Sequence, residues 1–380
     1  MARLLVLSHI PMIPLSFGGA RRVAALVRIA SQIFDEVALV AVFGSAQGTE
    51  GEWREGNVMI TQTRALRPRR GSSLVQSFLW GQPQYWKQAS DLRWRDFDLV
   101  QIELPYMWKV PQSLGIPFIL DEHNLDWEVL RQEARFRRRE SVARNLFWLY
   151  ARWRLRRIEY QALTHARSVL FSSRSEMDEA KSSTRGRIQR AEVIPNCVDR
   201  DMLEDYTSES PLPTVLFLGY LNWFPNEDAL HLIVKEIAPA LPDGIRIRVV
   251  GPGSLQLFDL PANVEMVGQV PEPKVEIRKA WVCIAPLRYG GGTKFKMVEY
   301  FAAGKPVVAS SKAIEGLEVT HGRDLVVEDD FGKYPAHIVN LIADRERARA
   351  LGRNARALAE QRYLWDLYDT RMKKVYASLM

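Results

Sequence analysis

The chain of 380 residues is too long for one ordinary hydrophobic core and suits two domains of about 150 to 200 residues each. Its hydrophobic fraction of 47% and charged fraction of 26% are typical of a soluble globular protein, and no apolar run reaches the length of a membrane-spanning helix. The net charge of +7 is unevenly spread. Residues 131–157 hold ten arginines against Glu133 and Glu140, which exceeds the excess of the whole chain, so the remainder is close to neutral.

The first residues and the two cysteines indicate the compartment. The apolar run at Met1–Pro14 is interrupted by Ser8 and His9 and lacks a small-residue cleavage site, so it predicts a buried first strand rather than a signal peptide. Cys197 and Cys283 are far apart in the sequence. Two free thiols in a reducing compartment are therefore expected, and with them a cytoplasmic protein.

Short apolar strands alternate with helical stretches along the first half of the chain. The strand at Leu4–Ser8 leads through Gly18 and Gly19 into an amphipathic helix over about residues 20–34. Continuous apolar strands of this length between helices are typical of a parallel sheet that is covered on both faces. Further strands are predicted at Val37–Phe43, Asp98–Ile102, Pro117–Leu120, Ser168–Ser172 and Glu192–Ile194.

The alternation lapses between residues 195 and 213, where prolines punctuate a polar stretch, and this is the predicted linker. It then restarts, with helices over about residues 226–240 and 345–361. The strands of the second half are predicted at Thr214–Leu218, Arg246–Val250, Val264–Met266, Ala280–Ala285, Val307–Ala309 and Leu325–Val327. We therefore predict an α/β protein with two Rossmann-like domains, over residues 1–200 and 201–360. A C-terminal helix within residues 361–380 is expected to pack back on the first domain, and the two parallel sheets are expected to face a central cleft.

The most informative segment is Pro286–Ser310. A predicted strand runs into three successive glycines, and a helix then begins near Thr293. Glycines let backbone N–H groups approach a ligand, and a helix N-terminus favours negative charge. The segment therefore predicts a site for an anion beside a hydroxyl-rich group, as in a sugar nucleotide, and a plain turn with solvated lysines is the alternative. The residues that carry this prediction are Gly290, Gly291, Gly292, Thr293, Lys294, Lys296 and Glu299.

This segment closely resembles the donor-binding part of glycosyltransferase family 4, whose members have the GT-B fold. In that family a glycine-rich loop opens a helix, a glutamate on the helix holds the nucleotide ribose, and a small-residue string A-x-G-x-P-V-V follows. Here the glutamate is Glu299 and the string is Ala302–Val308, which is similar to a bacterial branch linked to exopolysaccharide assembly. The resemblance implies a retaining transferase that takes its sugar from a UDP- or GDP-linked donor and uses no separate cofactor.

The loop after the first strand matches the family's Gly-Gly loop. Gly18 and Gly19 are therefore expected to contact the donor, although a plain turn between a strand and a helix explains the pair almost as well. Arg21 and Arg22 follow in the first turn of the helix. Either one is a candidate for a phosphate contact, or both are solvated.

His123 follows the predicted strand at Pro117–Leu120 and aligns with the family's active-site histidine, which contacts the transferred sugar near its reacting carbon. A surface or structural histidine is the alternative. The neighbouring Asp121 and Glu122 look like an acid/base pair, but adjacent residues usually point apart. A hydrolase that works with two carboxylates is therefore not expected.

Fixed positive charge is expected to take the place of a metal ion, and no metal is predicted. The D-x-D string at Asp96–Asp98 matches a metal-binding motif of the other large glycosyltransferase fold, but here it reads as a turn before a strand. No cysteine and histidine cluster has zinc spacing. Because a departing nucleoside diphosphate develops negative charge, Lys294 and Lys296 are assigned catalytic roles beside the glycine-loop amides.

The chain departs from the family pattern in two places. Many members carry a second glutamate eight positions before the ribose-binding one, where this chain has Gly291. Many also have an arginine and a lysine after the first strand of the second domain, but the loop Gly219–Asp228 has no basic residue. Gly219 is expected at the donor, and Gly268 and Val270 suit the nucleotide base, unless they belong to ordinary loops.

The arginine-rich segment, residues 131–157, also contains five aromatic side chains. Basic residues interleaved with aromatic ones suit an anionic membrane surface or a lipid-linked acceptor, and nucleic acid is the less favoured partner. A solvated helix whose aromatic side chains pack on the core, with arginine stems over apolar surface, is the alternative. The residues assigned to acceptor or membrane contact are Arg137, Arg138, Arg139, Trp148 and Trp153.

The expected function is therefore transfer of a sugar from a nucleoside diphosphate to a hydroxyl acceptor by a retaining, metal-independent enzyme. The acceptor is a lipid-linked or cell-surface glycan or a small molecule, and the enzyme is expected in the cytoplasm and at the inner face of the membrane. Two alternatives stay open. One is a sugar-nucleotide epimerase of the same fold, and the other is a membrane- or nucleic-acid-binding protein with an inactive cleft.

Overall fold

The computed structural model describes residues 1–13, 18–43, 48–64, 93–133, 142–204, 209–253 and 260–380. These residues form two compact units. The first unit contains the opening strand, Gly19–Pro195 and Tyr368–Met380, and the second contains Gly18 and Asn196–Leu367. The chain leaves the first unit at the start of the predicted linker and returns to it close to the C-terminus.

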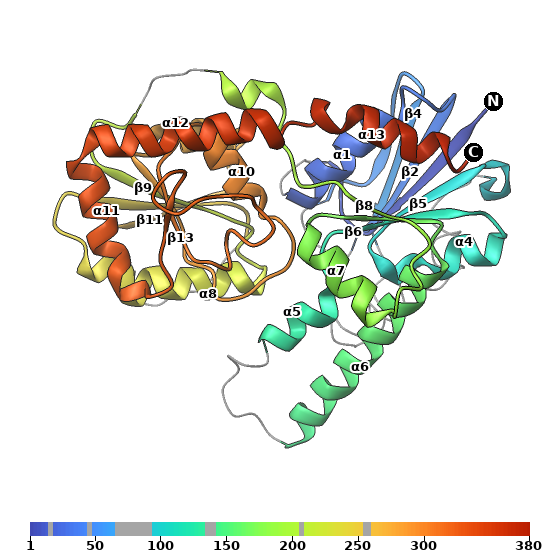
Figure 1. Ribbon diagram of the computed structural model, residues 1–380, viewed down its shortest axis with the longest axis horizontal. Coiled ribbons are helices and arrows are strands. Elements are labelled where there is room, and N and C mark those ends of the chain that lie inside the picture. Colours follow the sequence, from blue (N-terminus) through green and yellow to red (C-terminus); the bar gives the residue numbers. More distant parts are fainter. Residues whose placement is uncertain (14–17, 44–47, 65–92, 134–141, 205–208, 254–259) are drawn as a thin grey trace. The chain divides into compact units, whose positions relative to one another are not determined.

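The first unit is built on an eight-stranded sheet in the order β3-β4-β2-β1-β5-β6-β7-β8 (Figure 1). Its strands are β1 (Arg3–Ser8), β2 (Glu36–Phe43), β3 (Gly51–Glu55), β4 (Val58–Arg64), β5 (Leu99–Glu103), β6 (Phe118–Glu122), β7 (Ser168–Phe171) and β8 (Ala191–Val193). Neighbouring strands are parallel except β3 and β4, which form an antiparallel hairpin. The expectation of a purely parallel sheet is wrong at this edge. Every residue of β3 is at least partly exposed, so this strand lacks the apolar run that marks the others.

The helices of the first unit include α1, whose buried residues recur every three or four positions, as the sequence predicts. Residues 134–141, between α5 and α6, are not among the described residues. The last helix, α13, belongs to the first unit from Tyr368 onward. The helices are α1 (Gly18–Ala30), α4 (Lys109–Leu114), α5 (Asp126–Glu133), α6 (Val142–His165), α7 (Arg174–Ser183) and α13 (Asp366–Ala377).

A buried ion pair ties α1 to the sheet. The Arg22 guanidinium donates from Nε and Nη2 to the two Asp121 carboxylate oxygens, at 2.8 and 2.7 Å. Its Nη1 donates to the backbone carbonyl of Ile194 at 2.7 Å. The side chains of Arg22 and Asp121 are 1% and 0% exposed. The planar guanidinium matches a carboxylate in this geometry. The Arg22 side chain therefore connects α1 to β6 and to Ile194, which lies just after β8.

The second unit is built on a six-stranded parallel sheet in the order β11-β10-β9-β12-β13-β14. Its strands are β9 (Thr214–Leu218), β10 (Arg246–Val250), β11 (Val264–Gly268), β12 (Val282–Ala285), β13 (Val307–Ala309) and β14 (Val326–Val327). Each coincides with a predicted strand to within about two residues, because each is a short apolar run flanked by polar or glycine positions. Cys283 lies buried in β12, Cys197 is also buried, and neither forms a disulfide.

The helices of the second unit are α8 (Phe224–Leu232), α9 (Pro273–Lys279), α10 (Phe295–Ala302), α11 (Tyr334–Ala343) and α12 (Arg345–Arg362). The single helix predicted over residues 226–240 is α8 followed by a π turn at Ile233–Ile237 and a 3-10 turn at Ala238–Ala240. Pro239, which has no backbone N–H, lies in that last turn and prevents a regular continuation.

Two glycines allow α12 to approach the loop that follows α10. Gly304 adopts a left-handed conformation with φ of 65°, which ends the helix as the Gly-Lys-Pro string predicts. A Cβ on Gly352 would lie 2.0 Å from the carbonyl oxygen of Gly304. Only glycine therefore fits at position 352, and the last long helix of the unit packs directly on the predicted donor segment.

Replacement of Arg22 tests the buried ion pair. We expect Arg22→Met to lower the free energy of unfolding by about 3–5 kcal/mol, because it leaves the Asp121 carboxylate buried without its cation. Urea denaturation followed by circular dichroism measures this loss. Arg28→Met, at an exposed position on the same helix, is the matched control and should cost less than about 1 kcal/mol. Equal losses in the two variants would contradict the structural role of Arg22.

Candidate active site

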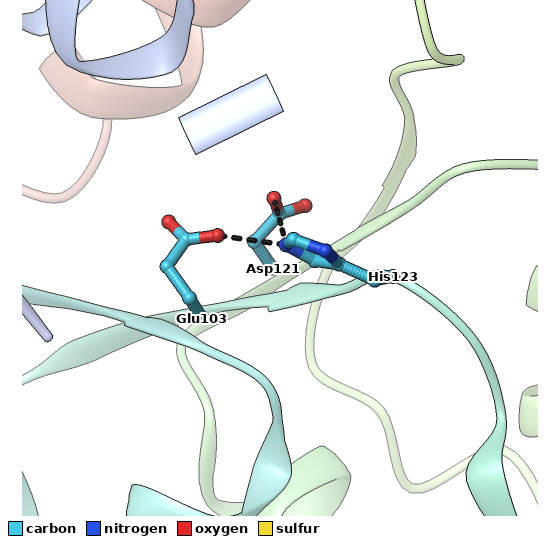
Figure 2. A group of neighbouring side chains, drawn as sticks. All are labelled: Glu103, Asp121 and His123. Carbon is cyan, nitrogen blue, oxygen red and sulfur yellow. Dashed lines mark hydrogen bonds and ion pairs between the residues drawn. The ribbon is translucent and has the colours of Figure 1, made fainter. Parts of the chain in front are cut away.

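Three polar side chains meet at the carboxyl ends of β5 and β6. Glu103 is the last residue of β5 and is paired in register with Asp121 of β6. His123 follows β6 by one residue. Because parallel strands end at the same edge of the sheet, the fold brings these residues together at the edge where α/β proteins bind ligands. Figure 2 shows the imidazole of His123 beside both carboxylates.

The imidazole is held by both acidic groups. His123 Nε2 lies 2.9 Å from Glu103 Oε2 and 3.3 Å from Asp121 Oδ2. Glu103 and Asp121 are fully buried, whereas the side chain of His123 is 11% exposed. The three ligand atoms lie within 4.8 Å of one another, a spacing that can hold a cation. The guanidinium of Arg22 already engages both oxygens of Asp121, and its positive charge would repel such an ion.

This arrangement separates the protonation states of the groups. Burial lowers the pKa of His123, but the hydrogen bonds and charges of Asp121 and Glu103 outweigh it and raise the pKa to about 9. Burial alone would raise the pKa of Asp121, yet Arg22 and His123 hold it below its usual range. Burial, reinforced by the charge of Asp121, raises the pKa of Glu103 to about 7. At neutral pH the imidazole therefore carries a positive charge.

Asp121 and Glu122 point to different environments, in agreement with their expected divergence. Both lie within β6 rather than in the loop after it. Glu122 is fully buried, and its carboxylate oxygens have no hydrogen-bond partner among the described residues. Burial and the nearby acidic groups Glu159 and Asp126 raise its pKa well above the usual range. Asp121 is bound by Arg22 and both carboxyl groups are fully buried, so neither is open to a substrate in the way that a two-carboxylate hydrolase requires.

Of the two predicted glycines, Gly19 lies next to His123. A Cβ on Gly19 would be 3.5 Å from His123 Nδ1 and 2.8 Å from the Cδ1 atom of Ile10, so glycine leaves space beside the imidazole. Gly18 belongs to the second unit, where a Cβ would lie 2.4 Å from the ring of Phe295. Arg22 is not placed for a phosphate contact, because its guanidinium is buried and donates hydrogen bonds to Asp121 and to the Ile194 carbonyl.

In the second unit the glycine loop leads from β12 to α10. Gly290 and Gly292 have φ values of 137° and 61°, which other residues rarely adopt. The helix begins at Phe295, two residues later than predicted, with Lys294 as its N-terminal flanking residue in an extended conformation. Thr293 is held by Asn196, which donates from its backbone N–H to Thr293 Oγ1 at 3.1 Å and from Nδ2 to the Thr293 carbonyl at 2.6 Å.

The two lysines occupy different environments. Lys294 Nζ donates to the carbonyl of Gly292 at 2.7 Å, within the loop itself. Lys296 is buried, donates to Asn226 Oδ1 at 2.7 Å and lies 4.1 Å from the centre of the Phe217 ring. Burial lowers the pKa of Lys296 to about 7. Asn226 also packs against Gly219: a Cβ added to Gly219 would lie 2.8 Å from the Cγ atom of Asn226.

Glu299 lies one turn further along α10 and is 3% exposed. At the edge of the same sheet, Gly268 ends β11 with φ of 79°, and the partly buried Val270 follows it.

Arg288 is a cation that the sequence analysis missed. Its Nε donates to Oδ2 of Asp228, on α8, at 2.8 Å. Its position three residues after the end of β12 could have indicated a role, because residues that follow parallel strands often contact ligands.

Helix α6 exposes an apolar face. Leu146, Leu149, Tyr150 and Trp153 are 61%, 53%, 54% and 55% exposed and recur at helical spacing. The opposite face, which includes Ala151 and Leu155, is buried.

Arginine accompanies this face. Arg156 and Arg157 are exposed near its C-terminal end, and the guanidinium of Arg157 lies 5.8 Å from the centre of the Trp153 ring. Trp148 is partly buried, and Arg137, Arg138 and Arg139 lie outside the described residues. Among the described residues, no helix combines the length and apolar character that crossing a bilayer requires.

Two family models match the chain. The model "Glycosyltransferase Family 4" covers residues 18–202, and the model "Glycosyl transferases group 1" covers residues 212–344. An exopolysaccharide phosphotransferase of Streptomyces coelicolor is 26% identical over 204 residues, which cover 50% of this chain and 21% of that protein. A GDP-mannose-dependent monoacylated alpha-(1-6)-phosphatidylinositol monomannoside mannosyltransferase of Corynebacterium glutamicum is 25% identical over 214 residues. That match covers 49% of this chain and 56% of the relative, so the chain spans well under two thirds of both proteins.

Solved structures share the fold over the whole chain. Sucrose-phosphate synthase from Thermosynechococcus elongatus matches with a TM-score of 0.79 at 16% identity and covers 100% of this chain and 99% of its own. The Anabaena protein HepE, solved in complex with UDP and glucose, matches with a TM-score of 0.71 at 15% identity and 100% coverage of both chains. The two parallel-sheet α/β units therefore have the GT-B fold. With the two family models side by side along the sequence, the chain belongs to glycosyltransferase family 4.

Proposed function

We propose that this protein is a retaining, metal-independent glycosyltransferase. It moves a sugar from a UDP- or GDP-linked donor to a hydroxyl of a lipid-linked or cell-surface glycan or a small molecule. The observation that carries the proposal is the construction of the β12–α10 segment. Glycines in left-handed conformations precede a helix N-terminus, Lys294 stands at that N-terminus, and the buried Glu299 lies one turn along.

The segment suits the two ends of a nucleoside diphosphate. Backbone N–H groups at a helix N-terminus and the helix dipole favour an anion, so they are assigned to the diphosphate. The Glu299 carboxylate accepts hydrogen bonds from the ribose hydroxyls. Lys296 is assigned a supporting role, because its ammonium group donates a hydrogen bond to Asn226 within the protein. Lys294, which is bonded to the carbonyl of Gly292, and Arg288, which follows β12, are the further cations assigned to the phosphates.

His123 is assigned to the transferred sugar. Its imidazolium is fixed by two buried carboxylates and leaves Nδ1 directed toward Gly19. In the proposed reaction the bond between the anomeric carbon and the diphosphate oxygen breaks while the acceptor oxygen bonds to the same face of that carbon. The acceptor proton passes to the departing diphosphate, so no protein nucleophile is required. Positive charge from Lys294 and the helix N-terminus stabilises the leaving group.

A second part of the proposal places the enzyme peripherally at the cytoplasmic face of a membrane. The exposed apolar face of α6 is rich in aromatic residues and is flanked by arginines, which suits anionic headgroups and the boundary with the acyl chains. The name of the mannosyltransferase relative describes a lipid acceptor for that protein. A lipid-linked acceptor is therefore the first class to test here.

Nucleotide binding tests the donor site. Calorimetric titration with UDP and GDP should show micromolar binding of one of them, unchanged by magnesium or by a chelator. Glu299→Ala should weaken that binding by about 10–100-fold, since it removes hydrogen bonds to a charged group. The exposed Glu346→Ala on α12 is the matched control and should bind like wild type.

Binding of the nucleotide by Glu299→Ala with wild-type affinity would refute the ribose role. Strict dependence on magnesium would refute metal independence. Release of an altered sugar nucleotide in the absence of any acceptor would favour the epimerase alternative.

Vesicle binding tests the α6 surface. The protein should bind vesicles that contain phosphatidylglycerol, and the binding should weaken as salt rises. Leu149→Ser combined with Trp153→Ser should reduce it at least about tenfold, because two apolar side chains no longer enter the interface. Leu212→Ser, at another exposed apolar position, is the control and should bind normally. Equal binding by all variants, or salt-dependent binding to DNA alone, would contradict the membrane assignment.

A further inference from the structure

A buried chain of hydrogen bonds runs from the last helix of the protein to His123. Tyr376 of α13 donates from its hydroxyl to Gln101 Oε1 at 2.6 Å. Gln101 Nε2 donates to Glu103 Oε1 at 2.6 Å, and the other oxygen of Glu103 accepts from His123 Nε2 at 2.9 Å. Tyr376, Gln101 and Glu103 are all 0% exposed. These three side chains are therefore shielded from bulk water, and each one supplies a hydrogen-bond partner to the next.

The direction of each hydrogen bond follows from the chemistry of the groups. A carboxylate can only accept, so Gln101 must present its amide nitrogen to Glu103. Its amide oxygen then faces Tyr376, and only a donor suits that position. The tyrosine hydroxyl is such a donor, and its ring is fixed against Phe34 in an edge-on contact with ring centres 5.4 Å apart.

We propose that Tyr376 is a positioning residue for His123. It holds the Gln101 amide in the one orientation that donates to Glu103, and this donation favours the ionised form of the Glu103 carboxylate that accepts from the imidazole. Without the hydroxyl, the amide is free to rotate and its donation to Glu103 weakens. A buried carboxylate that loses a donor binds its proton more tightly, and a protonated Glu103 no longer favours the imidazolium. The significance of this control for catalysis rests on the role proposed for His123 above.

Other charged groups also surround the imidazole. Asp121 on β6 accepts from it, and Arg22 on α1 neutralises Asp121. Among the described residues, the ionisable groups linked to His123 or to its carboxylate partners include His9, Arg22, Glu103, Asp121, Glu122, Asp126 and Tyr376. Because Asp121 stays paired with Arg22 and the hydrogen bonds of Tyr376 lead through Gln101 to Glu103, removal of the Tyr376 hydroxyl is expected to act mainly through Glu103.

The test measures the pKa of His123 directly. The chain has only six histidines, so labelling of histidine alone gives a short list of NMR resonances, and His123→Gln identifies the one that belongs to His123. In the wild-type protein this resonance should titrate with a pKa near 9. In Tyr376→Phe the titration should move down by about one unit, which is a tenfold change in proton affinity. The alkaline limb of the pH profile of kcat should move down with it.

Two further variants complete the experiment. Tyr334→Phe removes another buried hydroxyl, one that has no hydrogen-bond partner among the described residues, and should leave the titration of His123 unchanged. Gln101→Met interrupts the chain at its middle and should produce the same downward shift. Tyr376→Phe added to Gln101→Met should then have no further effect.

Two outcomes would overturn the proposal. In one, Tyr376→Phe folds and its His123 titrates as in wild type, which would reduce Tyr376 to a packing role. In the other, Tyr376→Phe shifts the titration equally with and without Gln101, which would show that the effect does not pass through the amide. Because the NMR readout needs no substrate, it separates a failure of this inference from a failure of the proposed transferase activity.

Discussion

The first unit depends on the ion pair between Arg22 and Asp121. A bidentate guanidinium in a dry site tolerates little displacement, so it fixes the distance between α1 and the end of β6. It also stabilises the ionised form of Asp121. That charge, together with Glu103, keeps the neighbouring imidazole protonated. A structural contact of the helix layer thus determines the charge of the residue that is the candidate for contact with the sugar.

The second unit forms its site mainly with its backbone. The glycine loop presents main-chain groups, and a threonine anchored by Asn196 holds the loop in place. Its buried lysine is turned toward Asn226 rather than outward. Hence the two candidate sites are built by different means: the first fixes a charged side chain through buried carboxylates, and the second, as proposed, uses the N–H groups of a glycine loop and a helix N-terminus. A site of this kind needs little reorganisation when an anion arrives.

Much of the fold could be predicted from the sequence because its strands are short continuous apolar runs, and the glycine loop and His123 lie where such strands end. The hairpin β3–β4 could not, since β3 is polar and exposed. Gln101 and Glu103 could be recognised only as polar residues two apart in an otherwise apolar strand, a spacing that places both on one face of the sheet. Their partner Tyr376 lies 275 residues from Gln101 in the sequence, and no local sequence pattern predicts a contact between residues that far apart.

Arg22 was one of two candidates for a phosphate contact, and its burial against Asp121 could not be foreseen for a related reason. Its position in the first turn of a helix after a glycine pair is shared by exposed, ligand-binding arginines. Only the approach of β6, about a hundred residues later in the sequence, decides that it is buried. Arg288 was missed because its partner Asp228 lies on α8, 60 residues earlier in the sequence, and no local pattern indicates that pairing. Local patterns therefore indicated where candidate sites lie, and tertiary contacts decided which of their side chains are engaged within the fold.

The first unit is discontinuous, since its last helix is made after the whole of the second unit. During synthesis the sheet, Gln101 and Glu103 leave the ribosome long before Tyr376 does. Until then the amide of Gln101 has no hydroxyl to orient it, and part of the first core stays open to water. The second unit, made of one nearly continuous stretch, is able to fold within that interval. The order of synthesis thus completes the hydrogen bonds that lead to His123 only after the second unit has been made.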